Sequence, residues 1–372
     1  MSYRIEAYDP ARHRAALLEL WATSLWGAER LAPAVEARHT WLYERAPDGP
    51  AHTVVAIHVE SGAVIGCASA LPRRLADRAG SGARAGMLCD FAIRRDHRTA
   101  GPAIAMQRRL AQDSAAAGFD LLFGYPNDAA LPIFKRLRWT VVGKARTWVR
   151  PLRTEAALRD RLERAAADRA PRAAPLLQPA IAPVARIGGA VADAALLAGQ
   201  ARRALRRPRA IRTEVVPRAD ERFDALWRRA RPPGLTGDKT SAFLQWRYAE
   251  FPTAAHRLVA VTGRGGDLLG FAACAVEDDV AVLCDLHCDW DADLDWVLLG
   301  VCDRLRREGL RSLYVGYAGG EWLGKKLESH HFFERPNDRS LIVHTRTDAP
   351  AALRDRVATV DAWHLFDGEL DI

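Results

Sequence analysis

The residues with the clearest capacity for chemistry stand at one turn of the chain, where Arg98 and Gly101 precede a helix-like apolar stretch. We expect a strand at 87–93, a turn of small residues and a helix at about 102–118. Such a turn directs free backbone N–H groups and the positive end of the helix dipole at one point. Arg98 adds a charged fork for phosphate oxygens, and Gly101 lets the backbone approach closely. The turn therefore predicts a pyrophosphate cradle.

A second motif follows after an apolar run at 119–125, which we expect to be a strand. The spacing Arg98-x-x-Gly101-x-Ala103 resembles the acyl-CoA signature of the GCN5-related N-acetyltransferases (GNAT). The second motif resembles the other signature of that family, with Asn127, Ala130, Phe134 and Trp139 in place and Arg138 where glycine is usual. Because the two signatures stand in the expected order, residues 1 to about 150 are identified as similar to a GNAT domain.

The resemblance implies a co-substrate, acetyl-CoA or another acyl-CoA, and the residues that bind it. By position in the family, Ile93 would bond the pantetheine, and the backbone amides around 98–103 would hold the pyrophosphate. Pro102 lacks one N–H donor that family members often have. The expected cofactor-binding set is Ile93, Arg98, Thr99, Ala100, Gly101, Ala103, Asn127 and Phe134.

The resemblance also implies direct transfer of the acyl group to an amine in a ternary complex. That chemistry needs an unprotonated amine, stabilisation of an oxyanion and a proton for the departing thiolate. The usual acid is a tyrosine, but Phe134 has no hydroxyl, so Tyr125 is the candidate acid and Asp90 the candidate base. Both residues also allow a structural interpretation. Tyr125 can be an aromatic ring that lines the site, and Asp90 can be a hydrogen-bonded carboxylate in the strand.

The second half of the chain repeats the first. The clearest pair is Leu283-Cys284-Asp285-Leu286 against Leu88-Cys89-Asp90-Phe91, and shorter echoes fall in the same order. We therefore predict an α/β fold of two GNAT-like domains, with mixed, mainly antiparallel sheets flanked by helices and a helical connector. The expected boundaries are 1–150 for the acyl-CoA-binding domain, 151–212 for the Ala/Arg-rich connector, 213–347 for the degenerate domain and 348–372 for a C-terminal tail.

The second copy lacks the residues of a phosphate cradle. It has Asp289, Asp291, Asp293 and Asp295 after its central strand, where the first copy has Arg98 and Gly101. Four carboxylates repel a phosphate, so we expect no CoA in this copy. Asp285 stands in the position of Asp90, which favours a structural role common to both copies.

Composition excludes several other classes of protein. An apolar fraction of 49% over 372 residues is typical of globular domains, and a formal charge of +8 suits an anionic cofactor. Basic and aromatic residues do not alternate as in proteins that stack on bases, so we expect no nucleic-acid partner. The six cysteines lack paired ligand spacing, which predicts reduced core thiols and no metal. The charged start and the lack of a span-length apolar run predict a cytoplasmic protein.

The connector allows two interpretations. Residues 176–199 are largely apolar but include Arg186, Asp193 and two interior prolines, and arginines cluster at 202–212. Such a segment can associate weakly with a membrane surface through residues 176–212. The favoured interpretation is a helical connector that packs against both domains and has solvated arginines.

The combined prediction is an acyl-CoA-dependent N-acyltransferase. The simplest reaction is acetyl transfer to a small-molecule primary amine, for which an amino sugar of a cell-envelope or polysaccharide precursor is one guess. The alternatives are a Fem-type aminoacyltransferase and a non-catalytic GNAT module that binds acyl-CoA. The sequence leaves the acceptor, the acyl chain length and the oligomeric state open.

Overall fold

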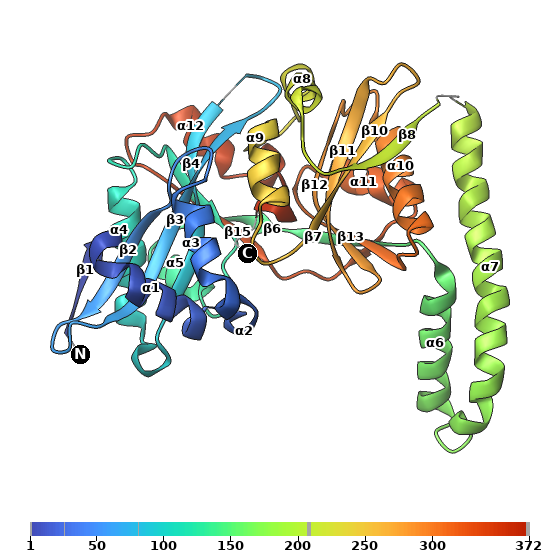
Figure 1. The fold of residues 1–372 in the computed structure, drawn as a ribbon, viewed down its shortest axis with the longest axis horizontal. Helices are drawn as coiled ribbons and strands as arrows, with labels where there is room; N and C mark the ends of the chain where they lie inside the picture. Colours follow the sequence, from blue (N-terminus) through green and yellow to red (C-terminus); the bar gives the residue numbers. More distant parts are fainter. Residues whose placement is uncertain (1, 26, 81, 207–209, 370–372) are drawn as a thin grey trace.

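The chain forms two α/β units, each built around an eight-stranded sheet with helices on its faces (Figure 1). The computed structural model describes residues 2–25, 27–80, 82–206 and 210–369. Both sheets are mixed and mainly antiparallel, with one parallel pair of neighbouring strands identified in each. The predicted fold class is therefore confirmed.

The first half supplies most of one sheet and the helices around it. The side chain of Asp9 accepts a bond from the Ala11 N–H, which caps the first long helix at its proline start. In chain order the elements are β1 (Tyr3–Ala7), α1 (Pro10–Ser24), α2 (Ala28–Leu31), η1 (Ala32–Ala34), α3 (Val35–Tyr43), β2 (His52–His58), β3 (Val64–Ala76), β4 (Gly82–Ile93), η2 (Arg95–His97), α4 (Ala100–Asp113), β5 (Leu121–Gly124), α5 (Leu131–Arg136), β6 (Thr140–Lys144) and β7 (Arg146–Pro151).

The second half follows a pair of helices and ends in a short strand. Its elements are α6 (Thr154–Arg169), α7 (Ala174–Arg206), β8 (Arg212–Val216), α8 (Glu221–Arg229), β9 (Thr236–Gly237), α9 (Ser241–Leu244), η3 (Gln245–Ala249), β10 (His256–Thr262), β11 (Leu268–Glu277), β12 (Val280–Cys288), α10 (Leu294–Arg307), β13 (Ser312–Gly319), α11 (Glu321–Ser329), β14 (Phe333–Arg335), β15 (Ser340–Thr345), α12 (Ala351–Val357), η4 (Val360–Ala362), β16 (His364–Phe366) and η5 (Asp367–Glu369).

The order of strands shows the same plan twice. One sheet runs β1-β2-β3-β4-β5-β15-β6, with β9 paired to β3 as its eighth strand. The other runs β8-β10-β11-β12-β13-β7-β14, with β16 paired to β13. The second sheet repeats the first strand by strand, so the sequence echoes correspond to equivalent elements. The helix α4 after β4 has its counterpart in α10 after β12.

The two halves exchange one strand each. β15 lies between β5 and β6 in the first sheet, and β7 lies between β13 and β14 in the second. Ala145 alone separates β6 from β7, which is too short for a hairpin turn, so β7 continues into the other sheet. The expected boundaries at 150 and 347 divide the sequence, but neither sheet is made from one continuous segment.

A tryptophan pair joins the halves near the centre of the molecule. The rings of Trp41 and Trp246 stack with centroids 4.2 Å apart and planes 4° from parallel. Each indole N–H donates to the backbone carbonyl of the other residue, at 2.7 Å and 2.9 Å. Trp41-Leu42-Tyr43 in the first half matches Trp246-Arg247-Tyr248 in the second, so this contact has the reciprocal form of a two-fold interface.

The connector forms a helical hairpin of α6 and α7 that extends beside the second half, far from the first (Figure 1). Arg306 and Arg311 pair with Asp193 and Asp160 of the hairpin, at 3.8 Å and 3.5 Å. α7 continues through Pro179 and Pro183. Among the described residues, none of the helices combines the length and the apolar character needed to cross a bilayer.

Candidate functional site

The turn between β4 and α4 carries the residues predicted to hold the cofactor. β4 pairs in parallel with β5 over Ala85–Met87, and it then continues to Ile93 before the chain turns. Beyond Met87 no pairing of β4 with β5 is found among the described residues. A strand edge of this kind offers N–H and C=O groups to an extended ligand.

The first turn of α4 presents backbone donors to solvent. Residues 98–101 are exposed, and the side chain of Thr99 does not cap the helix. First-turn N–H groups have no acceptor within their own helix, so the amides of Ala100 and Gly101 are open to a ligand. Ala103 follows with its side chain in the core. The predicted phosphate donors therefore lie on one turn, at the positive end of the helix dipole.

Arg98 fixes this turn to two neighbouring elements. Its Nε atom donates to the carbonyl of Ile93 at 3.2 Å, and its Nη2 atom donates to the carbonyl of Ser24 at 3.4 Å. A guanidinium has five N–H donors, so further donors remain for an anion. A Cβ atom on Gly101 would lie 3.1 Å from the Tyr3 hydroxyl, so the glycine makes room for the tyrosine.

The two cofactor residues of the second motif have structural contacts. The side chain of Asn127 accepts a bond from the Ala130 N–H at 3.0 Å and so stabilises the turn before α5. Phe134 is 3% exposed and packs edge-to-face against Trp139, with ring centroids 5.0 Å apart. Their contact with a cofactor stays a prediction.

Asp90, the candidate base, lies at a β-bulge of β4 and is fully buried. Its φ of +53° is in the left-handed region, which aspartate tolerates better than most residues. Its Oδ1 atom accepts a bond from Arg38 of α3 at 2.5 Å. Burial raises the pKa of Asp90, and the Arg38 guanidinium opposes that shift. The pair connects the bulge of the central strand to α3.

Tyr125, the candidate acid, follows β5 and lies where the two halves meet. Burial raises the pKa of its hydroxyl well above the usual value, and the nearby carboxylate of Asp367 adds to the shift. The tyrosine is therefore protonated at neutral pH and can donate a hydrogen bond. A raised pKa also makes it a weaker acid than a solvated tyrosine.

In the second half, the segment His364–Glu369 occupies the position next to β12 and β13. β12 pairs with β13 only over Val280–Leu283, and β16 then pairs with Tyr317–Gly319 further along β13. A Cβ atom on Gly368 would lie 2.5 Å from the Cys284 carbonyl. The place that corresponds to the expected pantetheine site is thus filled by the chain itself.

The acidic turn of the second half is also committed to local contacts. Asp289 accepts bonds from the N–H groups of Asp291 and Ala292. Asp295 pairs with Lys326 at 2.8 Å and with His330 at 2.6 Å. The turn that corresponds to the phosphate cradle is therefore acidic and internally bonded, which makes it unsuited to a phosphate.

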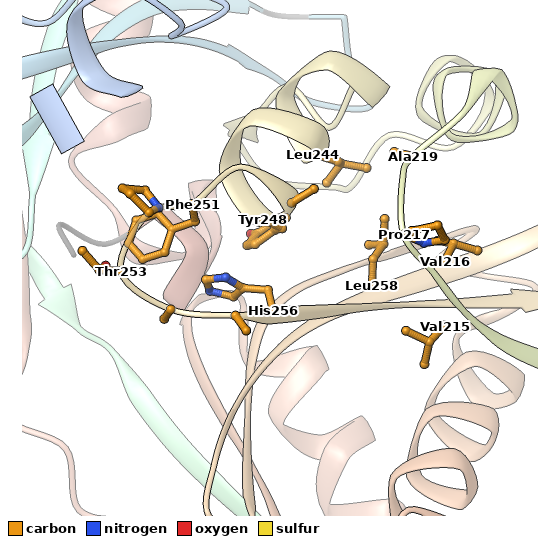
Figure 2. Close-up of a pocket in the computed structure, with 14 residues that line it drawn as sticks. Val215, Val216, Pro217, Ala219, Leu244, Tyr248, Phe251, Thr253, His256 and Leu258 are labelled. Carbon is orange, nitrogen blue, oxygen red and sulfur yellow. The ribbon is translucent and has the colours of Figure 1, made fainter. Parts of the chain in front are cut away.

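A pocket of about 580 Å³ opens in the second half (Figure 2). Tyr248, Phe251, His256 and Leu258 form much of its wall. A smaller pocket of about 300 Å³ shares Pro252 with it and reaches Trp41 of the first half. None of the predicted catalytic or cofactor-binding residues lines either pocket.

Buried histidines of the second half make its stability depend on pH. Burial lowers the pKa of His256 to about 4 and that of His287 to about 3, from a usual value near 6.5. Between pH 6.5 and 4 the unfolded chain therefore binds protons that the folded chain does not. We expect the free energy of unfolding to decrease as the pH is lowered through this range, by about 1.4 kcal/mol per pH unit for each such histidine.

Urea unfolding at pH 7, 6 and 5 measures this slope. His287→Gln should make it shallower, while the same change at the partly exposed His58 should leave it unchanged. Equal unfolding midpoints at pH 7 and pH 5 would contradict the expectation.

Sequence reasoning missed the partners of the predicted residues. Arg38 is 52 positions from Asp90, and Lys239, the buried partner of Asp285 at 2.8 Å, has no echo at the position of Arg38. Arg38 lies in α3 and Lys239 in the loop before α9, and basic residues at such positions are usually exposed, so the sequence did not predict that either is buried. The matching aspartates were visible, and both prove to be buried and paired with a cation.

Comparison with solved structures supports the same architecture. A probable N-acyltransferase from Enterococcus faecalis V583 is similar over 93% of this chain and 73% of its own, with a TM-score of 0.61 and 10% identity. A GCN5-related N-acetyltransferase from Kribbella flavida is similar over 94% of this chain and 72% of its own, with a TM-score of 0.54 and 15% identity. Eis1 from Mycobacterium abscessus is similar over 96% of this chain and 76% of its own, with a TM-score of 0.54 and 15% identity.

No family model and no curated protein matches the sequence. The structural likeness extends over both halves, including the second half that lacks the sequence signatures. The chain therefore has the fold of the GCN5-related N-acetyltransferases, in two copies that exchange a strand.

Proposed function

We propose that the protein is an acyl-CoA-dependent N-acyltransferase that transfers an acetyl group from acetyl-CoA to a primary amine. The observation that carries the proposal is the turn between β4 and α4, where open backbone amides, a helix N-terminus and Arg98 meet beside a free strand edge. The N-acetyltransferase names of similar solved structures support it. The acceptor is a small amine, with an amino sugar as one candidate.

Each predicted residue then has a role. The amides of Ala100, Gly101 and Ala103, together with Thr99 and Arg98, hold the pyrophosphate, and Ile93 bonds the pantetheine. Asn127 and Phe134 shape the turn and the core beside the thiol. Tyr125 supplies the hydrogen bond to the leaving thiolate.

In this proposal Asp90 positions the backbone of β4 and takes no proton from the amine. Its carboxylate is buried and bonded to Arg38, so a direct proton transfer would need the pair to open. We assign it the task of holding the bulge of β4, whose backbone lies beside the thioester. The amine attacks the thioester carbonyl, the bond from that carbon to the CoA sulfur breaks, and the amine proton passes through water to the departing thiolate.

A second candidate is a module that binds acyl-CoA without turnover. It is favoured by Phe134, which has no hydroxyl, and by the burial of Asp90. A Fem-type aminoacyltransferase is a weaker candidate, because the basic, amide-rich turn suits the pyrophosphate of CoA. Release of free thiol over a panel of amines distinguishes an enzyme from the binding module.

The decisive test is calorimetric titration of acetyl-CoA into the wild type and into Arg98→Glu plus Gly101→Asp. We expect one site per chain in the wild type and at least about a hundredfold weaker binding in the variant, since two new carboxylates repel the pyrophosphate. We expect one site and not two, because in the second half residues 364–369 fill the position of the pantetheine site and the turn that corresponds to the cradle is acidic. Thermal melting checks that the variant stays folded.

Arg264→Glu plus Gly265→Asp is the matched control. It makes the same change of charge in the exposed turn between β10 and β11, and it leaves Gly266 in place because the φ of +86° there favours glycine. A Cβ atom on Gly265 would have ordinary van der Waals contact, with the Asp267 side chain at 3.6 Å. The control should bind as the wild type does. No binding by the wild type would rule out the acetyl-CoA reading and bring the aminoacyl-tRNA alternative forward.

A further inference from the structure

The outer face of α7 is an apolar surface that no described residue covers. Its large side chains are exposed by 82% at Leu176, 43% at Leu177, 54% at Val184, 68% at Ile187 and 66% at Val191. With the exposed Ala180 they follow the spacing of one helix face, and we call this set the outer stripe.

The opposite face of α7 packs inward, so the stripe faces away from the body. Ile181 and Ala185 are buried, and a Cβ atom on Gly189 would lie 2.5 Å from the Cα atom of Glu155 in α6. Figure 1 shows α7 at the edge of the molecule farthest from the first half. The stripe is therefore open to a large, flat partner.

Charge surrounds the stripe without interrupting it. Between residues 173 and 201 the only charged side chains are Arg186, which pairs with Glu155 at 3.6 Å, and Asp193, which accepts a bond from Thr154. Basic residues precede and follow the stripe at Arg169, Arg172, Arg202, Arg203 and Arg206. The hairpin from 154 to 206 has nine arginines against five acidic residues. An apolar stripe with arginines at both ends complements an anionic lipid surface.

We propose that the hairpin of α6 and α7 docks on a membrane rich in anionic phospholipid, with α7 parallel to the surface and the outer stripe among the acyl chains. The inference is independent of the acyl-transfer proposal. A second copy of the chain fits the stripe less well. The stripe is about 22 Å long, so pairing two of them buries well below the roughly 1,200 Å² of a stable interface.

Vesicle flotation tests the proposal, with the full chain and two kinds of vesicle. One kind is phosphatidylcholine alone, and the other contains phosphatidylglycerol as well. The wild type should float with the second kind, and less so at high salt. Val184→Glu plus Ile187→Glu should weaken this binding about a hundredfold, because it removes two apolar contacts and adds two like charges.

Val59→Glu plus Phe333→Glu is the matched control, since these side chains are exposed by 48% and 52% elsewhere on the surface. It should float as the wild type does. The proposal is overturned if the wild type floats with neither kind of vesicle, or if the Val184 and Ile187 variant floats equally well. It is also overturned if sedimentation shows a wild-type dimer that this variant dissociates, since a second copy then covers the stripe.

Discussion

Replacing Glu369 with alanine is expected to lower the free energy of unfolding by about 3–5 kcal/mol, because it removes a carboxylate that two buried cations share. Lys239 would keep Asp285 at 2.8 Å, but Arg73 would keep just the longer contact with Asp48 at 3.4 Å. Glu369 accepts two bonds from Arg73 of β3, at 2.9 Å and 3.1 Å, and one from Lys239 at 2.7 Å. All three side chains are at most 3% exposed. Gly237 leaves the space through which Arg73 passes, since a Cβ atom there would overlap the guanidinium.

The charge of Glu369 also gives the loss a pH dependence. Burial alone would raise the pKa of Glu369, but attraction by Arg73 and Lys239 outweighs it and holds the pKa well below the usual 4.5. The folded chain therefore keeps a carboxylate that the unfolded chain protonates. Its contribution is fully present above about pH 5 and is lost as the pH falls below that value.

Urea unfolding at pH 7 and pH 4 measures both effects. Glu277→Ala serves as the control, because Glu277 pairs with Arg30 across the same two halves at 72% and 84% exposure. An exposed pair contributes little, so the control should unfold near the wild-type midpoint. A Glu369→Ala variant with the midpoint of the control would show that the buried carboxylate does not lock the halves together.

Local sequence patterns predicted the elements but not their partners. The apolar runs and turns located β4, α4 and β5, with boundary errors such as the end of α4 at Asp113 in place of 118. The echoes between halves located the second sheet. Exchange of β7 and β15 left no sequence signal, because strand pairing depends on partners far away in the chain.

In the candidate site, too, features made by consecutive residues were predictable, and features that depend on distant residues were not. The cradle was predictable because a strand, a small-residue turn and a helix start are consecutive in sequence. The segment that fills the position of the pantetheine site in the second half comes from residues 364–369, which were predicted to be part of a C-terminal tail. Its interaction with β12 and β13 follows from packing across a long chain separation, and no spacing rule predicts it.

Replacing Asp90 with asparagine is expected to cost about 3 kcal/mol of stability, since the amide cannot neutralise the buried guanidinium of Arg38. Asparagine tolerates the φ of +53° as aspartate does, so the change removes charge and leaves the bulge conformation accessible. Adding Arg38→Met should recover most of the loss, because an apolar replacement of a buried ion pair is often neutral. Arg94→Met is the control, as Arg94 forms only a surface pair with Glu19 at 3.5 Å.

The same variants separate the two roles of Asp90 in acyl transfer. A direct base sets the acidic limb of the pH profile of kcat/KM, so its removal would flatten that limb. A positioning residue lowers kcat by a similar factor at every pH and leaves the limb in place. Because Asp90 is buried against Arg38, and Asp285 is buried against Lys239 in the half without a cradle, we expect the second result. Flattening of the acidic limb in Asp90→Asn, with stability unchanged, would make Asp90 the base.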